Sequence, residues 1–304
     1  KAARSRPLLV EIGCEEIPAR FLDGARDDFG RRLVEALQEA RLLPSETALP
    51  RCYSTPRRLV VWVPEVLVRQ ADLVEEIVGP PVKVAIDAAG KPTKAAESFA
   101  AKNAVEVSQL ARVITPKGEY LAVRKTRRGK PARRLLPAFL PGVITGLSFP
   151  KSMYWVAKAG PRFVRPIRWL LALLGEGKEA SVVPFEFAGV RSADLSYGHR
   201  ALRPRAVRIQ SFEDYASKLR RSYVEFDQET RRQTIQNKAQ VLLEEPLRLV
   251  EDEKLVEWIV NSTEWPSGIR GGFDERFLHL PREILITVMR DHQKYFSVEN
   301  AEGR

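Results

Sequence analysis

Two short apolar runs flank a long amphipathic segment near the start of the chain, and this order restricts the folds open to it. The first run, residues 8–13, and the second, residues 58–63, are typical of buried strands because they are short and rich in Leu and Val. Between them, apolar residues recur at steps of three and four from residue 19 to residue 43, which predicts a helix with one buried face, ended by Pro44. A strand, a helix and a second strand predict an α/β layer, with parallel and antiparallel pairing both left open.

The remaining pattern predicts an α+β fold class, with mixed α/β sheets and packed helices. Two domains suit a chain of 304 residues. We predict a core that is interrupted by a smaller inserted α/β domain and followed by a helical segment. The predicted boundaries are 1–74 for the first part of the core, 75–149 for the inserted basic domain, 150–210 for the continuation of the core, 211–262 for the helical segment and 263–304 for the return to the core.

Local signals predict the elements within these parts. Thr93 is placed as the N-cap of a helix over 93–103, and Asp227 as the N-cap of a helix that reaches about residue 244. The other predicted elements are a hairpin over 111–130, a helix over 132–147 kinked or broken at Pro141, a strand over 180–190, a helix from Ser211, a short strand over 223–226, helices over 255–260 and 282–291, and a strand over 294–298.

Positive charge is concentrated in one segment of the chain. Of 50 Lys and Arg residues and 39 Asp and Glu residues, residues 111–170 hold 14 of the former and one of the latter. That segment therefore carries +13, whereas the other 244 residues together carry −2. Such a segment is typical of a surface that meets a polyanion, so a nucleic acid or an acidic partner protein is favoured. For any single residue within it, a solvated basic face is the favoured interpretation.

Aromatic residues are interleaved with these cations. The four are Tyr154, Trp155, Phe163 and Trp169. Aromatic rings among cations can stack on unpaired bases, and the alternative is that they are ordinary core residues. For four of the chain's tryptophans the core interpretation is favoured; these are Trp155, Trp169, Trp258 and Trp265.

Motifs for several chemistries are missing from the sequence. It contains no GxGxxG, GxxxxGK[ST], HExxH or GxSxG, and its three histidines do not stand at metal-ligand spacing from one another or from a cysteine. Its two cysteines form no CxxC, which favours a cytoplasmic chain with reduced thiols. The longest uncharged stretch, 16 residues over 135–150, is broken by prolines and glycines and is shorter than the roughly 20 apolar residues that a membrane span needs. We therefore expect no catalytic residue, no metal site and no membrane span.

The string over residues 197–200 has two interpretations that the sequence leaves open. Gly198 gives access to the backbone, while His199 and Arg200 can donate hydrogen bonds, and arginine can hold a phosphate with two parallel bonds. This combination suits an anion or a ribose phosphate. A turn that caps the sheet explains the same residues equally well.

The string over residues 55–59 contains two adjacent arginines, Arg57 and Arg58, at the entry to a predicted strand. One interpretation is contact with RNA. The favoured interpretation is that these arginines pair with acids such as Glu15 and Glu16, because cations beside a buried strand are normally paired.

Eight strings, in the expected order and at about the expected spacing, resemble one protein family. They are Leu9–Ala19, Ser54–Leu59, Gly79–Pro81, Phe149–Met153, Phe163–Trp169, Gly198–Arg200, Glu264–Pro266 and His292–Phe296. The chain resembles the beta subunit of the bacterial two-subunit glycyl-tRNA synthetase over nearly its entire length. The one departure is Cys14, where that family has Thr, and it removes a hydroxyl hydrogen bond.

The resemblance implies an alpha2beta2 aminoacyl-tRNA synthetase, a cytoplasmic ligase of protein biosynthesis that charges tRNA with glycine at the expense of ATP. The alpha subunit would bind ATP, Mg and glycine and make glycyl-adenylate, so no cofactor is expected on this chain. The beta subunit would recognise tRNA(Gly), and its core would be similar to that of the phenylalanyl-tRNA synthetase beta subunit. The chain resembles the N-terminal part only, and an HD-like domain and an anticodon-binding domain would follow it.

The basic segment and the resemblance together predict a tRNA-binding surface. Its candidate residues are Lys125, Arg127, Arg128, Lys130, Arg133, Arg134, Lys151, Arg165, Arg168, His199 and Arg200. The alternative is a structural module that docks the alpha subunit through an acidic surface and leaves tRNA recognition to the C-terminal domains. A hydrolytic editing site is not favoured, since a glycine pocket excludes larger amino acids by size and the sequence offers no nucleophile–base pair.

Overall fold

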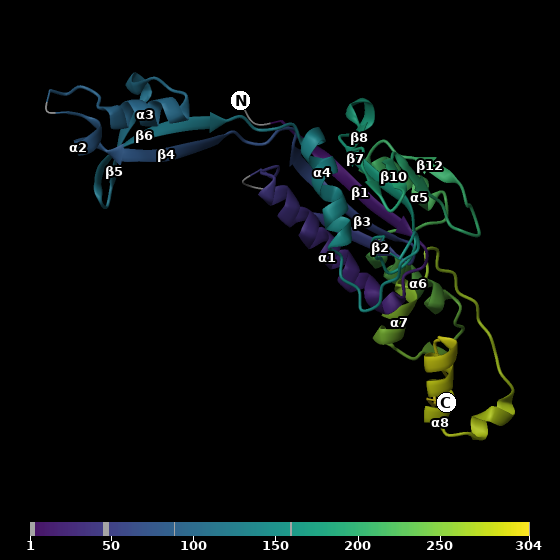
Figure 1. Cartoon of the computed structure of the whole chain (residues 1–304). Coiled ribbons are helices and arrows are strands. Elements are labelled where there is room, and N and C mark those ends of the chain that lie inside the picture. Colours follow the sequence, from purple (N-terminus) through teal and green to yellow (C-terminus); the bar gives the residue numbers. More distant parts are fainter. Residues whose placement is uncertain (1–3, 45–48, 88, 159, 304) are drawn as a thin grey trace. The chain divides into compact units, whose positions relative to one another are not determined.

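The computed structural model describes residues 4–44, 49–87, 89–158 and 160–303 (Figure 1). The chain forms two compact units, a larger one made of Lys1–Val68 and Ala132–Arg304 and a smaller one made of Arg69–Pro131. The smaller unit is thus an insertion in the larger one. Strands and helices occur in both units, so the predicted α+β class with mixed sheets and packed helices is confirmed.

A seven-stranded sheet forms the centre of the larger unit. Its order is β2 (Arg51–Thr55), β3 (Arg58–Leu67), β1 (Ser5–Cys14), β7 (Ile167–Leu174), β10 (Val190–Ala193) and β9 (Glu186–Phe187), with β8 (Ser181–Val182) paired to β7. The predicted strands over 8–13 and 58–63 are confirmed as β1 and β3, which pair antiparallel. Among the described strands of this sheet, β10 and β7 alone run parallel.

The prediction of one strand over 180–190 is wrong, because two short strands, β8 and β9, stand in its place. Pro184 lies between them, and a proline has no N–H to donate to a sheet ladder. β8 extends the antiparallel ladder of β7, whereas β9 pairs with β10. Because β1 pairs along the other edge of β7, β8 and β10 share one edge of β7, and β9 lies on the far side of β10.

Helix α1 (Ala19–Glu39) confirms the predicted amphipathic helix, but it ends before Pro44. Arg41 adopts a left-handed φ of 52°, and the Leu42 N–H then donates to the Leu37 carbonyl at 2.8 Å. This hydrogen bond satisfies a carbonyl that the end of the helix would otherwise leave free. The backbone turn at Arg41, and not the proline, therefore ends α1.

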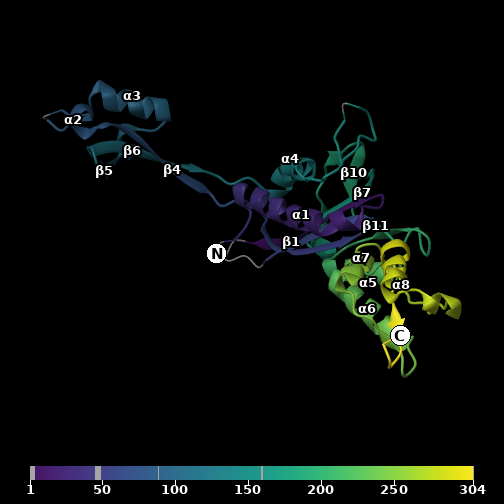
Figure 2. The ribbon, with the colours of Figure 1, turned by 90° about the horizontal axis from the view of Figure 1, so that it is seen from below.

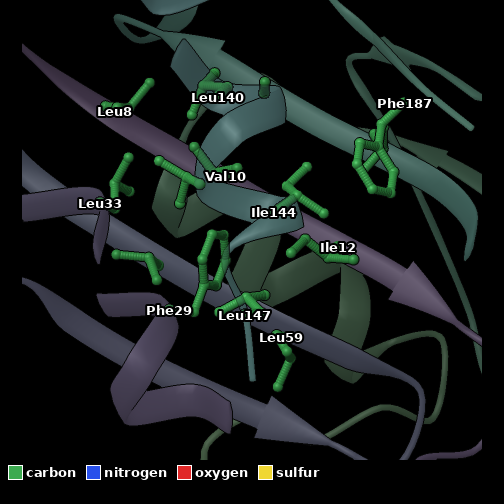
Figure 3. Close-up of a cluster of buried hydrophobic side chains, with 14 of the residues drawn as sticks. Leu8, Val10, Ile12, Phe29, Leu33, Leu59, Leu140, Ile144, Leu147 and Phe187 are labelled. Atoms are coloured by element: carbon green, nitrogen blue, oxygen red, sulfur yellow. The ribbon is translucent and has the colours of Figure 1, made fainter. Parts of the chain in front are cut away.

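The main hydrophobic core lies between the sheet and two helices, α1 and α4 (Ala132–Thr145). Figure 3 shows side chains from β1, from both helices and from β9 converging on this core. Its central members include Leu8, Val10, Ile12, Phe29, Leu33, Leu140, Ile144 and Phe187. Burial of large aliphatic and aromatic side chains such as these is the main contribution to the stability of a domain of this size.

Helix α4 lies in the larger unit, whereas the predicted inserted domain over 75–149 included it. The helix runs without a break through Pro137 and Pro141, so the predicted break at the second proline does not occur. Leu136 and Leu140 on its apolar face are fully buried in the core shared with α1. That packing places the boundary of the insertion at Pro131. The finer predicted division of the larger unit into 150–210, 211–262 and 263–304 stays a prediction.

The opposite face of the sheet is covered by α5 (Phe212–Arg220), the helix predicted from Ser211. The rings of Phe212, Tyr215 and Phe226 pack against one another, and those of Phe212 and Phe226 also pack against Tyr53 of β2. Residues 223–226, predicted as a short strand, form none, because Tyr223 takes a left-handed φ of 59°. The side chains of Val224 and Phe226 are still buried in the core.

A helical region follows α5. Asp227 caps α6 (Gln228–Val241), as predicted, by accepting from the backbone N–H groups of Glu229 and Thr230. The helix lies beside α7 (Glu253–Val260) (Figure 2), and Ile235, Val256 and Val260 form their shared core.

The remaining elements of the larger unit are β11 (Leu195–Tyr197) paired with β12 (Ala206–Arg208), β13 (Arg248–Leu249) paired with β14 (Val298–Glu299), α8 (Arg282–Thr287), the π-helix Val288–Gln293, and the 3-10 turns Gly177–Glu179 and Glu275–His279. The predicted strand over 294–298 is wrong for residues 294–297, because β14 begins only at Val298.

The smaller unit has its own sheet and its own small core. β4 (Leu73–Pro81), β6 (Gly118–Arg127) and β5 (Ala111–Thr115) form an antiparallel sheet in that order, which confirms the predicted hairpin. Helices α2 (Val82–Ala85) and α3 (Lys94–Asn103), with the 3-10 turn Val107–Gln109, accompany it, and Ala85, Ala96 and Leu121 form the buried cluster. Thr93 is the N-cap of α3, but its hydroxyl donates to the Val84 carbonyl and does not cap the helix.

Among the described residues, no helix combines the length and the apolar character that crossing a membrane requires.

We predict that Leu140→Ala destabilises the larger unit by about 2–5 kcal/mol, because it opens a cavity in the core between α4 and the sheet. All five tryptophans of the chain lie outside Arg69–Pro131, so urea unfolding followed by tryptophan fluorescence reports on the larger unit. Val241→Ala, at a side chain that is 85% exposed at the end of α6 in the larger unit, is the control and should change the midpoint little. An unchanged midpoint in Leu140→Ala would contradict the placement of α4.

Candidate nucleic-acid interface

Motif strings that are far apart in the sequence meet at one end of the central sheet, where β1 ends and β3 and β7 begin. The Cys14 N–H donates to the Arg57 carbonyl at 2.9 Å, and the Glu15 N–H donates to the Pro166 carbonyl at 3.0 Å. These bonds join the strings Leu9–Ala19, Ser54–Leu59 and Phe163–Trp169. Cys14 itself is fully buried at this junction, and burial raises the pKa of its thiol.

At the centre of this junction lies a buried ion-pair network. Arg58 is fully buried and forms ion pairs with Glu11 at 3.3 Å and with Glu264 at 3.0 Å. The Thr55 hydroxyl donates to Glu264 Oε1 at 2.6 Å, and the Ser196 hydroxyl donates to Glu11 Oε1 at 3.0 Å. Because Glu264 follows α7, the network fastens the helical region to the sheet.

The pKa values of the two carboxylates of the network are shifted in opposite directions. Burial raises the pKa of Glu11, and this outweighs the nearby positive charge of Arg58. Burial also acts to raise the pKa of Glu264, but Arg58 and the hydrogen bond from Thr55 outweigh it, so the pKa lies below its usual value. Despite its burial, Arg58 has a raised pKa because two carboxylates face it. The arrangement therefore keeps Arg58 and Glu264 charged at neutral pH.

The prediction that Arg58 pairs with acidic residues is confirmed, but the predicted partners are wrong. The arginine pairs with acids, but these are Glu11 and Glu264 and not Glu15 or Glu16. In the β1–β3 register Gly13 lies opposite Arg58, so Glu11 points to the same face as Gly13 and can reach the guanidinium. The signal in the sequence was a carboxylate inside an apolar strand, which is costly to bury without a cation.

Four arginines lie around Glu15 and Glu16 at the surface of the same junction. We call Arg57, Arg165, Arg168 and Arg200 the arginine cluster. Arg168 donates to Glu15 at 2.6 Å, Arg200 lies 3.6 Å from Glu15 and 3.8 Å from Glu16, and Arg165 donates to the Glu16 carbonyl oxygen at 3.0 Å. The Arg57 guanidinium lies 5.5 Å from the ring centroid of Trp169. Arg168 and Arg200 thus pair with the two carboxylates, while Arg165 binds a backbone carbonyl and Arg57 lies beside an aromatic ring.

Glu15 is the acid most strongly held by this cluster. Its hydrogen bond from Arg168 keeps its pKa below the usual value, against a smaller effect of burial, and the charges of Arg168, Arg200 and Arg57 act in the same direction. Arg168 and Arg200 remain more than half exposed, so solvent and ligands can reach their guanidinium groups. Surface pairs of this kind contribute about 1 kcal/mol or less to stability.

His199 belongs to a tight turn. Its Nδ1 accepts from the backbone N–H groups of Ala201 and Leu202, both at 3.2 Å, which leaves Nε2 as the donor. Gly198 is required there, because a Cβ atom would lie 2.3 Å from the Arg203 carbonyl oxygen. Of the two interpretations of this string, the contacts support the turn for His199, while Arg200 joins the arginine cluster.

The other predicted tRNA-binding residues lie in both units. Lys125, Arg127, Arg128 and Lys130 belong to the smaller unit, on β6 and just after it. Lys125 is half-buried opposite Glu75 on β4, and the other three are exposed. In the larger unit, Arg133 and Arg134 are exposed on the first turn of α4, and Lys151 is exposed beyond its end. The basic segment over 111–170 is therefore divided between two folded bodies.

The four aromatics of the basic segment divide by burial. Phe163 and Trp169 are buried, Trp155 is half-buried, and Tyr154 is exposed. The core interpretation is confirmed for Trp169. It is wrong for Trp258, which is 41% exposed on α7 and carries the ammonium of Lys294 over its ring at 5.1 Å.

Sequence patterns did not single out Arg231 on α6 as a structural residue. This arginine is fully buried and donates to the carbonyl oxygens of Val260, Glu225 and Ser54 at 3.0, 2.7 and 2.7 Å. Burial lowers its pKa to about 10. No pattern in the sequence separates it from Arg232 next to it, which is partly exposed and pairs with Glu253.

Within the part of the chain that the structure describes, no three His, Cys, Asp or Glu side chains gather as a metal site would require. The chemistry available at the junction is that of cations, hydrogen-bond donors and carboxylates. Such groups bind and position an anion.

Comparison with known proteins fits this arrangement. A family model for the glycyl-tRNA synthetase beta subunit matches residues 8–304. Three curated relatives are beta subunits of glycine–tRNA ligase: that of Acidobacterium capsulatum is 46% identical over 97% of this chain, that of Moorella thermoacetica 42% over 98%, and that of Myxococcus xanthus 41% over 99%. In each case the chain spans 42% of the relative's length.

These matches define the class, a subunit of an aminoacyl-tRNA synthetase. The chain belongs to the family of glycyl-tRNA synthetase beta subunits, of which it spans about two fifths. The resemblance carried by the eight strings is thereby confirmed. Five of those strings meet at the junction described above: Leu9–Ala19, Ser54–Leu59, Phe163–Trp169, Gly198–Arg200 and Glu264–Pro266.

We predict that Glu264→Gln lowers the free energy of unfolding by about 3–5 kcal/mol, since it leaves the buried Arg58 with a weaker partner. Glu11→Gln is the matched control at the other carboxylate of Arg58. It should cost about 1 kcal/mol, because the fold already disfavours the charged form of Glu11 and glutamine keeps an acceptor for Ser196. Urea unfolding at pH 7 measures both variants.

The loss of stability in Glu264→Gln should depend on pH. The pKa of Glu264 is lowered by folding, so its contribution is complete above the unfolded carboxyl pKa of about 4.3 and is lost as the pH falls through the folded value. The difference between the wild-type chain and Glu264→Gln should therefore be constant above about pH 5 and shrink below about pH 4. A difference that stays constant down to pH 3.5 would contradict an ionised Glu264.

Proposed function

We propose that this chain supplies the tRNA-positioning and subunit-assembly part of a glycine–tRNA ligase. The single observation that carries the proposal is the arginine cluster at the point where the family's motif strings converge. There Arg168 and Arg200 pair with Glu15 and Glu16 and still stay more than half exposed. Exposed guanidinium groups bind phosphate oxygens through paired hydrogen bonds. Such contacts position a nucleic acid without reading its sequence, so they suit a subunit that orients tRNA for chemistry performed elsewhere.

In this proposal the adenylating chemistry belongs to the alpha subunit. That subunit binds ATP, Mg and glycine, and the two kinds of chain assemble as alpha2beta2 in the cytoplasm. The sequence contains neither of the glycine-rich nucleotide-binding motifs GxGxxG and GxxxxGK[ST], which supports a non-adenylating role. We further propose that its sheet-and-helix core is of the phenylalanyl-tRNA synthetase beta-subunit kind.

The proposed tRNA-binding residues act as two groups. In the smaller unit they are Lys125, Arg127, Arg128 and Lys130, and in the larger unit they are Arg133, Arg134, Lys151, Arg165, Arg168 and Arg200, with His199 shaping the turn that carries the last. Each contact should contribute modestly, because a phosphate contact is one of many along the backbone. Removal of several cations at once is therefore the informative change.

Docking of the alpha subunit is the second candidate function, and a separate observation favours it. Apolar side chains are exposed along residues 269–298, among them Ile269, Phe273, Leu278, Ile284 and Tyr295. Scattered apolar residues are common on protein surfaces, but a series along one segment marks a protein interface more often than a nucleic-acid interface. Copurification with the alpha subunit but without tRNA would favour docking as the main role of this chain.

The test of the proposed function is fluorescence-anisotropy binding of the chain to tRNA(Gly) and to an unrelated tRNA at about 50 and 200 mM salt, where phosphate-driven affinity falls steeply. We expect binding that weakens sharply with salt. Absence of binding at the lower salt concentration would contradict a tRNA surface on this chain.

We predict that reversing four charges together, in Arg127→Glu, Arg128→Glu, Arg133→Glu and Arg134→Glu, weakens tRNA binding and flattens its salt dependence. Each lost phosphate contact should lower the slope of log affinity against log salt by about 0.7–0.9. The matched control reverses four exposed cations outside the basic segment, at Lys178, Arg191, Arg221 and Lys254, for the same change in net charge. Equal losses in both variants would indicate a general charge effect and contradict the assignment.

We predict that Glu15→Gln strengthens tRNA binding at about 50 mM salt by up to about tenfold, because the carboxylate of Glu15 competes with phosphate for Arg168 and Arg200. Glutamine keeps an oxygen that accepts from Arg168, so the loop should keep its conformation. Glu179→Gln, which removes the carboxylate paired with Arg4 and Arg6, is the control and should leave affinity unchanged. Weaker binding in Glu15→Gln would mean that Glu15 holds the arginines in position for phosphate and does not compete with phosphate for them.

A further inference from the structure

A loop of the larger unit carries exposed aromatic and basic side chains that the arginine cluster does not use. Its two ends are joined by backbone hydrogen bonds, from the Met153 N–H to the Phe163 carbonyl at 2.7 Å and from the Phe163 N–H to the Met153 carbonyl at 3.2 Å. We call residues 151–162 the aromatic loop. Its described residues are 151–158 and 160–162.

The base of the aromatic loop is anchored in the core. Phe163 is buried and packs edge-on against Phe149, with 5.0 Å between ring centroids. Trp155 is half-buried and packs edge-on against Phe163 at 6.5 Å. These contacts hold the beginning and the end of the loop in place, so its outer side chains need little further ordering when they bind.

Tyr154 is the aromatic side chain that this anchoring leaves accessible. It is 44% exposed, and the guanidinium of Arg162 lies over its ring, 5.2 Å from the centroid. Arg162 also donates to the Ser152 carbonyl oxygen at 3.3 Å, which holds it near the ring. An exposed aromatic ring beside a planar guanidinium is the kind of surface on which an unpaired base stacks.

The charge of the loop favours a polyanion. Residues 151–162 contain three cations and no acid. Among the described residues, none of Lys151, Lys158 and Arg162 forms an ion pair. No carboxylate in the part of the chain that the structure describes therefore pairs with them, unlike Arg168 and Arg200, which share Glu15.

We propose that the aromatic loop binds unpaired nucleotides of an RNA, with a base stacked on Tyr154 and the adjacent phosphates held by Lys151, Lys158 and Arg162. The inference rests on the proposed function, since it names the part of a tRNA that this loop contacts. A duplex keeps its bases stacked inside the helix and offers phosphates to the cations alone, so it would leave the tyrosine ring unused. The combination of ring and cations therefore selects single-stranded RNA over double-stranded RNA.

The test uses the purified chain and two fluorescein-labelled probes, a ten-residue oligouridine and a blunt ten-base-pair RNA duplex, together with tRNA(Gly), in anisotropy titrations. Tyr154→Ala should weaken oligouridine binding by about 5- to 150-fold, the range expected from the loss of one stacked base. Duplex binding should change by less than about twofold, because phosphate contacts remain. Tyr154→Phe should keep the affinity of the wild-type chain, since stacking needs the ring and not the hydroxyl.

Controls separate stacking from loss of structure. Tyr223→Ala removes a tyrosine that is 41% exposed outside the loop and should not change oligouridine binding. Because Tyr154 is exposed, Tyr154→Ala should also unfold in urea at the wild-type midpoint.

Three results would overturn the inference. They are oligouridine and tRNA binding that is unchanged in Tyr154→Ala, an equal loss in Tyr154→Phe and Tyr154→Ala, and an equal loss for duplex and single strand. A Tyr154→Ala chain that binds RNA normally but no longer copurifies with the alpha subunit would assign the loop to protein docking instead. If the wild-type chain bound oligouridine but not tRNA, the proposed function would be wrong, but binding of single-stranded RNA by the loop would still be supported. If tRNA bound normally in all variants, only the loop assignment would fail.

Discussion

The buried ion pairs of Arg58 are the interaction on which the rest of the larger unit depends. A guanidinium with no exposed surface is tolerated only when carboxylates face it, and here Glu11 comes from the central strand and Glu264 from beyond α7. Segments from the start and the end of the chain are thereby fixed at one end of the sheet. Arg231 strengthens this attachment by donating to carbonyl groups of three separate segments.

That buried network also determines what the surface above it can do. Glu11 and Glu264 satisfy the buried Arg58. Within the described residues, the ion pairs of the arginine cluster outside are those of Arg168 and Arg200 with Glu15 and Glu16. A fully neutralised cluster would have little attraction for phosphate, and without carboxylates the arginines of the cluster would repel one another. Partial neutralisation leaves exposed guanidinium groups in a fixed arrangement, which suits a surface that positions a polyanion.

Particular residues show how far sequence reasoning reached. The β1 and β3 strands, α1 and the capping of α6 by Asp227 followed from periodicity and local chemistry, because those signals act over a few residues. The boundary at Pro131 did not follow, since the same apolar face of α4 would suit either unit and only its packing on α1 decides. Likewise, Arg231 and Arg232 are adjacent in sequence and differ entirely in burial.

The sequence by itself determined the family, the concentration of positive charge over 111–170 and the strand–helix–strand start of the sheet, because each is written in residue types and spacing. Tertiary structure alone decided which charges are buried partners and which face solvent. It joined Glu11 to Glu264 through Arg58, divided the basic segment between two units, and left Tyr154 exposed while burying Phe163 and Trp169. The physical reason is that burial and ion pairing depend on contacts between segments far apart in the chain, which no local pattern specifies.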